Sequence, residues 1–189
     1  MKQVVDHTVE ALLAGRTVLY PTDTIWGVGC DATQAVAVEA VYALKRRDPH
    51  KSMLVLAAPE WLEGMDCGEA AKLLLRSERP TTVVLPVSAL PFGTRIAANL
   101  PADDGTVGVR VPLGSEFCLS VLRKLERPIV STSANFSGQP SPATYADIDP
   151  ELVRAVGYAV PNAAGACGAV RTSRILRLNP DGSITTVRP

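Results

Sequence analysis

The sequence predicts an α/β protein in which helices pack on a sheet that is parallel in part. Helical and strand patterns alternate along almost the whole chain, which is typical of such sheets. The 189 residues, with 47% hydrophobic content, suffice for one substantial core. The chain has no internal repeat, low-complexity tract or linker, so we expect a single domain over residues 1–189.

The predicted elements follow one another in a regular order. Apolar residues at helical spacing predict helices over 3–14, 33–47, 68–77 and 115–126. Short apolar runs predict strands over 17–21, 52–58, 81–88, 106–112, 128–134, 173–179 and 183–189. Residues 151–160 mix both patterns, and "PDG" at 180–182 predicts a tight turn between the last two strands.

Two helices allow finer predictions. Gly15 is well suited to end the first helix. In the second helix Thr33 is the expected N-cap. Its inward-facing residues should be Val36, Val38, Val41, Tyr42 and Leu44.

Charge and cysteine content exclude several classes of protein. The formal net charge is zero and the isoelectric point about 6.7, so no overall positive field would hold nucleic acid. No zinc pattern, and hence no metal site, is formed by Cys30, Cys67, Cys118, Cys167, His7 and His50. Free thiols, the absence of a signal-peptide pattern and the lack of a ~18-residue apolar run indicate a cytoplasmic protein with no membrane segment.

Polar residues gather where predicted strands end. "YPTDTIWGVGCDA" at 20–32 places Thr22, Asp23 and Thr24 directly after a strand, with Gly27 and Gly29 close behind. Ligands of open α/β sheets tend to bind at the carboxyl ends of strands, and glycine lets the backbone approach them. A turn rich in hydroxyls is the equally weighted alternative.

A basic cluster follows the second predicted helix. "LKRRDPHKS" brings Lys45, Arg46, Arg47 and Lys51 within seven residues. Cations at a helix C-terminus offset its dipole, which alone would explain one or two of them. Four cations are more than the helix dipole requires. They would suit a triphosphate, whose desolvation requires concentrated positive charge.

An arginine also interrupts an apolar strand. Arg110 lies between Val109 and Val111, so it either faces solvent or lies inside the sheet and needs an anion. Its planar guanidinium would suit a carboxylate.

The hydroxyl-rich stretch "PIVSTSANFSGQPSP" at 128–142 is either a surface loop or a ligand socket. It contains no Gly-x-Ser-x-Gly, and the chain has no P-loop and no complete Gly-x-Gly-x-x-Gly. From the residues alone we expect a hydroxyl-lined, cation-rich cleft for a phosphorylated ligand and a small anion, with no reaction specified.

Five motifs in order, "YPTDTIWGVGCDA", "KRRDPHKSMLVL", "RPTTVVLP", "VGVRVP" and "STSANFSGQPSP", resemble the YrdC/TsaC family of threonylcarbamoyl-AMP synthases. The resemblance runs from about residue 17 to the C-terminus. It implies a YrdC/RibB-like fold, a twisted mixed sheet flanked by helices with a large concave cleft, as one YrdC-like domain. It favours the socket over the surface loop.

The resemblance also implies a reaction. L-threonine, bicarbonate or CO2, and ATP would give threonylcarbamoyl-AMP and pyrophosphate, with Mg²⁺ accompanying the ATP. A downstream threonylcarbamoyl-transferase complex would then modify tRNA at adenosine 37, and direct tRNA contact is a further possibility. Catalysis would be mostly positioning and charge neutralisation.

The matching positions imply site residues. The family's Lys-x-Arg and following Lys fall on Lys45, Arg47 and Lys51, with Lys51 the expected catalytic residue. The other expected ATP contacts are Ser133, Asn135, Ser173 and Arg188. The expected L-threonine contacts are Thr22, Thr24, Arg110, Ser131 and Ser133.

The sequence departs from the family pattern in four places. Arg79 stands where the family has glycine, and it should crowd the loop before Thr82. Trp26 replaces a tyrosine, and Ser52 and Met53 replace Pro-Leu after Lys51. Arg174 replaces threonine in a Ser-Thr pair.

Three other functions are compatible with the sequence. One is a double-stranded RNA or tRNA binder that uses the same basic cleft. Another is a carbamoyl-adenylate enzyme of the kind found in hydrogenase maturation, although those chains are much longer and carry zinc-finger-like cysteines. The third is a regulatory homologue without synthase activity.

Overall fold

The computed structural model describes residues 1–48, 51, 53–63, 65, 68–162 and 172–189 of the chain. Its α-helices are α1 (Lys2–Leu13), α2 (Ala35–Leu44), α3 (Glu69–Arg76), α4 (Glu116–Leu125) and α5 (Pro150–Ala155). Its strands are β1 (Val18–Tyr20), β2 (Gly27–Gly29), β3 (Leu54–Leu56), β4 (Thr81–Pro86), β5 (Thr106–Arg110), β6 (Ile129–Ser133), β7 (Tyr158–Ala159), β8 (Arg174–Leu178) and β9 (Ile184–Arg188). Short 3-10 helices are η1 (Pro59–Trp61), η2 (Val87–Ala89), η3 (Gly93–Arg95) and η4 (Tyr145–Asp147).

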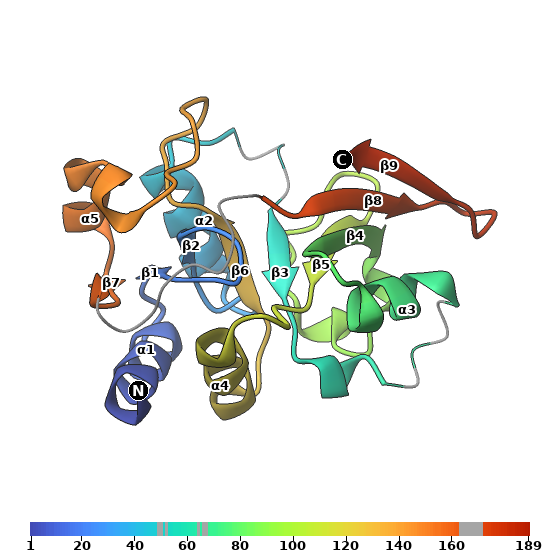
Figure 1. The fold of residues 1–189 in the computed structure, drawn as a ribbon, viewed down its shortest axis with the longest axis horizontal. Coiled ribbons are helices and arrows are strands. Elements are labelled where there is room, and N and C mark those ends of the chain that lie inside the picture. The colour runs from blue at the N-terminus through green and yellow to red at the C-terminus, as the bar shows by residue number, and fades with distance from the viewer. Residues whose placement is uncertain (49–50, 52, 64, 66–67, 163–171) are drawn as a thin grey trace.

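All nine described strands form one sheet in the order β7-β1-β2-β6-β3-β5-β4-β8-β9. The pairs β1–β7, β3–β5 and β4–β8 are parallel, and the other pairs are antiparallel. The sheet twists, so that β3 and the β8–β9 hairpin run in different directions across the molecule (Figure 1). The predicted α/β class with a mixed, twisted sheet is therefore confirmed.

Helices pack on this sheet and complete the core. Helices α1 and α4 lie side by side (Figure 1), and α3 lies next to β4. Helix α4 begins well, because the Ser115 hydroxyl accepts a hydrogen bond from the Cys118 amide at 3.2 Å. Its C-cap, Glu126, adopts a left-handed conformation with φ of 56°.

The pleat of the central strands separates the core from a second face. Val28, Val55, Val109 and Val130 come from four neighbouring strands and are fully buried in the core. Because successive strand residues point to opposite faces, the residues that alternate with them share the other face. That second face carries the candidate site.

Three details of the sequence prediction were wrong. The segment Gly27–Gly29 forms strand β2, although its two glycines gave no strand pattern. Val36 is 79% exposed, because the inward face of α2 follows the helical spacing of Val38, Val41 and Tyr42. The N-cap of α2 is Gln34, since the Thr33 hydroxyl donates instead to Asp31 at 2.7 Å.

Candidate functional site

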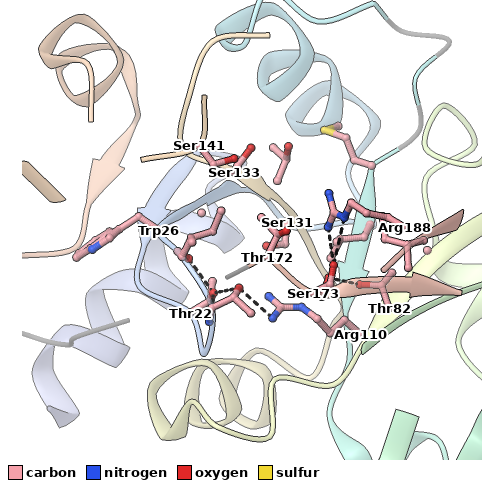
Figure 2. A pocket seen from close by; sticks show the side chains of 18 of the residues that line it. Thr22, Trp26, Thr82, Arg110, Ser131, Ser133, Ser141, Thr172, Ser173 and Arg188 are labelled. Carbon is pink, nitrogen blue, oxygen red and sulfur yellow. Dashed lines mark hydrogen bonds between the residues drawn. The ribbon is translucent and has the colours of Figure 1, made fainter. Parts of the chain in front are cut away.

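A cavity of about 250 Å³ opens on the second face of the central strands (Figure 2). We call it the cleft. Three arginines line it, Arg47, Arg110 and Arg188, and no carboxylate is among the lining residues that the structure describes. Nine hydroxyl residues also line it: Thr22, Thr24, Thr82, Ser131, Thr132, Ser133, Ser141, Thr172 and Ser173.

Strand register brings these side chains together. Leu54 of β3 lies opposite both Gly108 of β5 and Ser131 of β6. Thr82 of β4 lies opposite Arg110 of β5. Each of these five residues lines the cleft, so two rows on one face of the sheet supply hydroxyls, apolar contacts and a cation.

Two glycines keep the floor of the cleft open. A Cβ on Gly27 would meet the Ser131 hydroxyl and the Thr22 methyl at 3.4 Å. A Cβ on Gly108 would lie 3.2 Å from the Thr82 methyl and 3.3 Å from the Leu54 Cβ. The concave shape therefore depends on the absence of side chains at both positions.

Arg110 is buried, so the alternative that it is a solvated strand residue is wrong. Its Nη1 donates to Asp23 Oδ1 at 2.6 Å and to the Thr24 hydroxyl at 3.2 Å. Both side chains of the Arg110–Asp23 pair are at most 5% exposed. The buried Nε of Arg110 has no hydrogen-bond partner in the described part of the chain, which leaves one edge of the guanidinium for a ligand.

The threonines after β1 form a small network next to Arg110. The Thr22 hydroxyl donates to the Ile25 carbonyl at 2.8 Å and accepts from the Thr24 amide at 3.0 Å. The two threonine hydroxyls lie 2.9 Å apart. This turn fixes both hydroxyls at the cleft wall beside the guanidinium (Figure 2).

The opposite wall comes from the C-terminal strands. The Thr82 and Ser173 hydroxyls are 2.8 Å apart and buried. Arg188 donates to the Ser173 carbonyl through Nη2 at 2.7 Å and through Nε at 3.2 Å, so its guanidinium lies over this wall (Figure 2). Arg79 is exposed and does not displace Thr82 from the cleft, so the expected crowding is absent.

The residues of the basic cluster have different surroundings, and of Lys45, Arg47 and Lys51 only Arg47 is among the described lining residues of the cleft. Arg47 lines the cleft, and its Nε donates to the Lys51 carbonyl at 2.9 Å. Lys51 is exposed and is not among the described lining residues. Lys45 is only 1% exposed, and its ammonium donates to the backbone carbonyls of Ser133 and Asn135.

Asn135 shapes the loop that follows β6. Its Nδ2 donates to the carbonyls of Phe136 at 2.9 Å and Gln139 at 2.8 Å. Its Oδ1 is buried without a partner among the described residues, and its side chain is not part of the described lining. Ser133, by contrast, lines the cleft directly.

The sequence analysis missed several residues that line the cleft. It also missed Asp23, which accepts a hydrogen bond from Arg110. Asp23 was visible between two expected site residues but received no role. Thr132, Ser141 and Thr172 line the cleft and lie in or next to the matched motifs. The alternation of side chains along β4 could have placed Thr82 on the cleft face of the sheet. Trp26 lines the cleft and packs edge-to-face on Tyr145, with ring centroids 4.9 Å apart.

Other sequence expectations concern metals, thiols and membranes. Across the described ranges, no three His, Cys, Asp or Glu side chains cluster as metal ligands. Cys30 and Cys118 are buried, and the Cys118 thiol donates to the Pro21 carbonyl at 3.3 Å, while Cys67, Cys167, His50 and Ser52 lie outside the described residues. No helix within the described chain is long and apolar enough to cross a membrane.

Fold and cleft together define an α/β protein with a cationic, hydroxyl-lined cavity on the second face of its sheet, a lining of the kind that suits anionic ligands. The chain belongs to the Sua5/YciO/YrdC family, whose description reads "Telomere recombination" and which matches residues 10–189.

Relatives and solved structures agree with this assignment. A Stenotrophomonas maltophilia protein named threonylcarbamoyl-AMP synthase is 32% identical over 82% of this chain and 84% of its own length. The structure of P. abyssi Sua5 complexed with L-threonine is 26% identical, with a TM-score of 0.75 over 98% of this chain. This chain spans only 53% of that protein. E. coli YciO, 20% identical over 100% of this chain and 89% of its own length, shares the fold with a TM-score of 0.76.

Proposed function

We propose that this protein is a threonylcarbamoyl-AMP synthase. It would form threonylcarbamoyl-AMP and pyrophosphate from L-threonine, bicarbonate or CO2, and ATP, and so act as a nucleotidyltransferase. The observation that carries this proposal is the cleft lining, in which three arginines and nine hydroxyl residues surround one cavity. The family's relatives named threonylcarbamoyl-AMP synthase support it.

The amino-acid end of the cleft would be the wall around Arg110. Asp23 occupies Nη1, so a threonine carboxylate would bind the edge that includes the unpartnered Nε. The Thr24 hydroxyl accepts from Nη1 and lies 2.9 Å from the Thr22 hydroxyl, and Ser131 and Ser133 line the same cleft. Their hydroxyls would bind the polar groups of threonine.

The nucleotide end would be the wall that carries Arg47 and Arg188. Both guanidinium groups line the cleft, where they would offset the charge of a triphosphate. Ser133 and Ser173 would add hydroxyl contacts, and Asn135 would act through the shape of its loop. Lys51, whose side chain is exposed, would reach the phosphates from outside the described lining.

Mg²⁺ would accompany the nucleotide. The described lining offers hydroxyl oxygens and no carboxylate, and Mg²⁺ commonly binds through substrate phosphates and water. The cleft therefore fits an ion that phosphate oxygens hold, and the ion would supply charge neutralisation there.

The chemistry needs two bond-forming steps. The amine of threonine adds to the carbon of CO2 and loses a proton, which gives a carbamate; bicarbonate would enter by losing hydroxide. A carbamate oxygen then attacks the α-phosphorus of ATP, and the bond from that phosphorus to the bridging oxygen breaks to release pyrophosphate. The arginines and Lys51 would stabilise charge on the phosphates, which is the larger part of such catalysis.

We further propose that the product serves tRNA modification in the cytoplasm. The adenylate is a mixed anhydride that water destroys, so a transferase complex would accept the threonylcarbamoyl group directly after release and pass it to adenosine 37 of tRNA.

Pyrophosphate release with each substrate omitted in turn tests the proposal. Release should require ATP, threonine and a CO2 source together, and valine should not replace threonine, because a site that hydrogen-bonds a hydroxyl discriminates strongly against its methyl analogue. Release that ignores the amino acid would contradict the proposal. No turnover together with salt-sensitive RNA binding would favour the RNA-binding alternative.

A further inference from the structure

Lys45 differs from every other cation of the basic cluster. It directly follows helix α2, is 1% exposed and is the largest of the fully buried side chains in the described structure. A lysine is seldom buried to this degree unless its ammonium is fully hydrogen-bonded. Its surroundings therefore identify what the charge does.

The ammonium binds the backbone of the neighbouring strand and loop. Nζ donates to the Ser133 carbonyl and to the Asn135 carbonyl, each at 2.5 Å. The Lys45 carbonyl accepts a hydrogen bond from the Ser137 amide at 2.9 Å. Three hydrogen bonds thus tie one residue to the end of β6 and to residues 134–140, which we call the β6 loop.

The end of helix α2 directs the lysine into this position. The Arg47 amide donates to the Tyr42 carbonyl and the Arg46 amide to the Ala43 carbonyl, both at 3.0 Å. This closure requires a left-handed residue, and Arg46 supplies it with φ of 51° although it is not glycine. Lys45 itself is still right-handed, with φ of -83°, and it lies on the buried face of α2 four residues after Val41. The turn then redirects the chain, and Arg47 lines the cleft.

At neutral pH Lys45 carries the charge that its hydrogen bonds to the loop carbonyls require. Burial, with the neighbouring Arg47 charge second, lowers the pKa of Lys45 to about 8, so the ammonium is mostly charged at neutral pH. Two of the three N–H donors of the ammonium are used on carbonyls and the side chain is 1% exposed, so a phosphate could bind only the third donor and only if the surrounding groups moved. The same two bonds hold the carbonyls of Ser133 and Asn135 at the lysine. The Ser133 residue itself lines the cleft.

We propose that Lys45 is a positioning residue that fixes the β6 loop, and with it Ser133, at the wall of the cleft, and that it is not a ligand of the nucleotide phosphates. Its effect on the reaction is indirect and passes through the loop. The kinetic consequence rests on the proposed function, whereas the effect on the loop does not.

Amide hydrogen exchange of the ligand-free protein tests the loop directly. Lys45→Met keeps the apolar stem and removes the ammonium, so peptides that cover residues 133–140 should exchange at least about tenfold faster. Arg47→Met is the matched control, since it removes, from the same helix end, a cation whose Nε donates to the Lys51 carbonyl, and its loop exchange should match the wild type. Unchanged loop exchange in Lys45→Met overturns the proposal even if the protein has no synthase activity.

Steady-state kinetics give the second readout. Lys45→Met should raise the KM for threonine and the KM for ATP together, each by about tenfold, because the loop borders the site of both. Arg47→Met should raise mainly the KM for ATP. An ATP-only effect of Lys45→Met would mean that the lysine binds phosphate, and the proposal would be withdrawn.

Lys45→Arg decides the question if Lys45→Met does not fold. It keeps the charge but puts a larger, planar group where a compact ammonium fits, so loop exchange and both KM values should rise. Wild-type loop exchange in Lys45→Arg, with only the KM for ATP changed, would overturn the proposal.

Discussion

Arg110 and Asp23 form an ion pair at 2.6 Å beneath the cleft, with both side chains almost completely buried. The pair joins the arginine of β5 to the turn after β1, which are 87 residues apart in the sequence. It neutralises Arg110 in the absence of substrate and holds Nη1, so that the Nε edge remains for a ligand. The anion that the sequence predicted for Arg110 is thus supplied in part by the protein itself.

Breaking this pair should destabilise the fold. Asp23→Asn leaves a buried guanidinium without its counter-charge, and we expect the free energy of unfolding to fall by about 3 kcal/mol. Chemical denaturation of the variant measures the loss. The double variant Asp23→Asn/Arg110→Met removes both charges and should recover most of it. Equal losses in the single and double variants would mean that the charges are not coupled.

Arg110→Lys should affect threonine selectively. Lysine keeps one contact to Asp23 but cannot present a second, planar edge to a carboxylate. We expect the KM for threonine to rise about tenfold or more and the KM for ATP to change less than about threefold. Initial-rate kinetics with each substrate varied give both values. A threonine KM like that of the wild type would remove Arg110 from the amino-acid site.

Lys51→Ala should abolish product formation and leave stability nearly unchanged. Lys51 is exposed, and the removal of a solvated charge alters the free energy of unfolding by no more than about 0.5 kcal/mol. Lys72→Ala is the control, because Lys72 is an exposed lysine of α3 whose ammonium donates to Glu69 at 3.4 Å and which is not among the described lining residues of the cleft. Full activity of Lys51→Ala would show that the residue has no part in the reaction.

Gly27 and Gly29 of β2 provide a matched pair of alanine variants, which separate an effect on stability from an effect on the cleft. A Cβ on Gly29 would lie 1.8 Å from the Val130 carbonyl oxygen, so Gly29→Ala should cost several kcal/mol of stability, about 3 or more. A Cβ on Gly27 meets its neighbours at an ordinary 3.4 Å. Gly27→Ala should therefore fold normally yet raise both substrate KM values, because the new methyl group enters the floor of the cleft. Thermal unfolding and kinetics of both variants check this, and a Gly27→Ala protein with wild-type KM values would contradict the position of the site.

Successive side chains of a strand point to opposite faces of the sheet, and this alternation made much of the fold and part of the site predictable. Alternation along β4 and β5 predicts that Val83 and Val109 share the core while Thr82 and Arg110 share the other face, and the structure has this arrangement. Strand β2 was not predicted, because three residues with two glycines carry neither β-branched side chains nor alternation.

The burial of Lys45 was not predicted, because its charge was weighed and its place on the helical face of Val38 and Val41 was not. Lys45 and Arg47 are two residues apart, and their common charge suggested a common target. Lys45 lies four residues after Val41 on the buried face of α2, whereas Arg47 follows a left-handed turn at Arg46, a position where glycine is the usual residue. Burial of a lysine also depends on carbonyls nearly 90 residues away, at Ser133 and Asn135.

The titration of Lys45 gives the stability an unusual pH dependence. The pKa of Lys45 is about 8 in the folded protein against an ordinary value of 10.5, because burial and then Arg47 oppose its charge. Below about pH 8 both the folded and the unfolded chain carry the proton, so this lysine adds no slope. Between about pH 8 and 10.5 the unfolded chain binds more protons than the folded one, so the free energy of unfolding should rise with pH.

The rise should be visible as a difference between proteins. From pH 7.5 to pH 10 the wild type should gain about 1 to 3 kcal/mol relative to Lys45→Met, measured by urea denaturation at each pH. Tyrosines, cysteines and the amino terminus titrate in the same range, but they are common to both proteins and cancel in the difference. Lys45→Arg is a second reference, because a guanidinium does not titrate there. A flat or falling difference would mean that the ammonium of Lys45 is not held in a buried site that disfavours its charge.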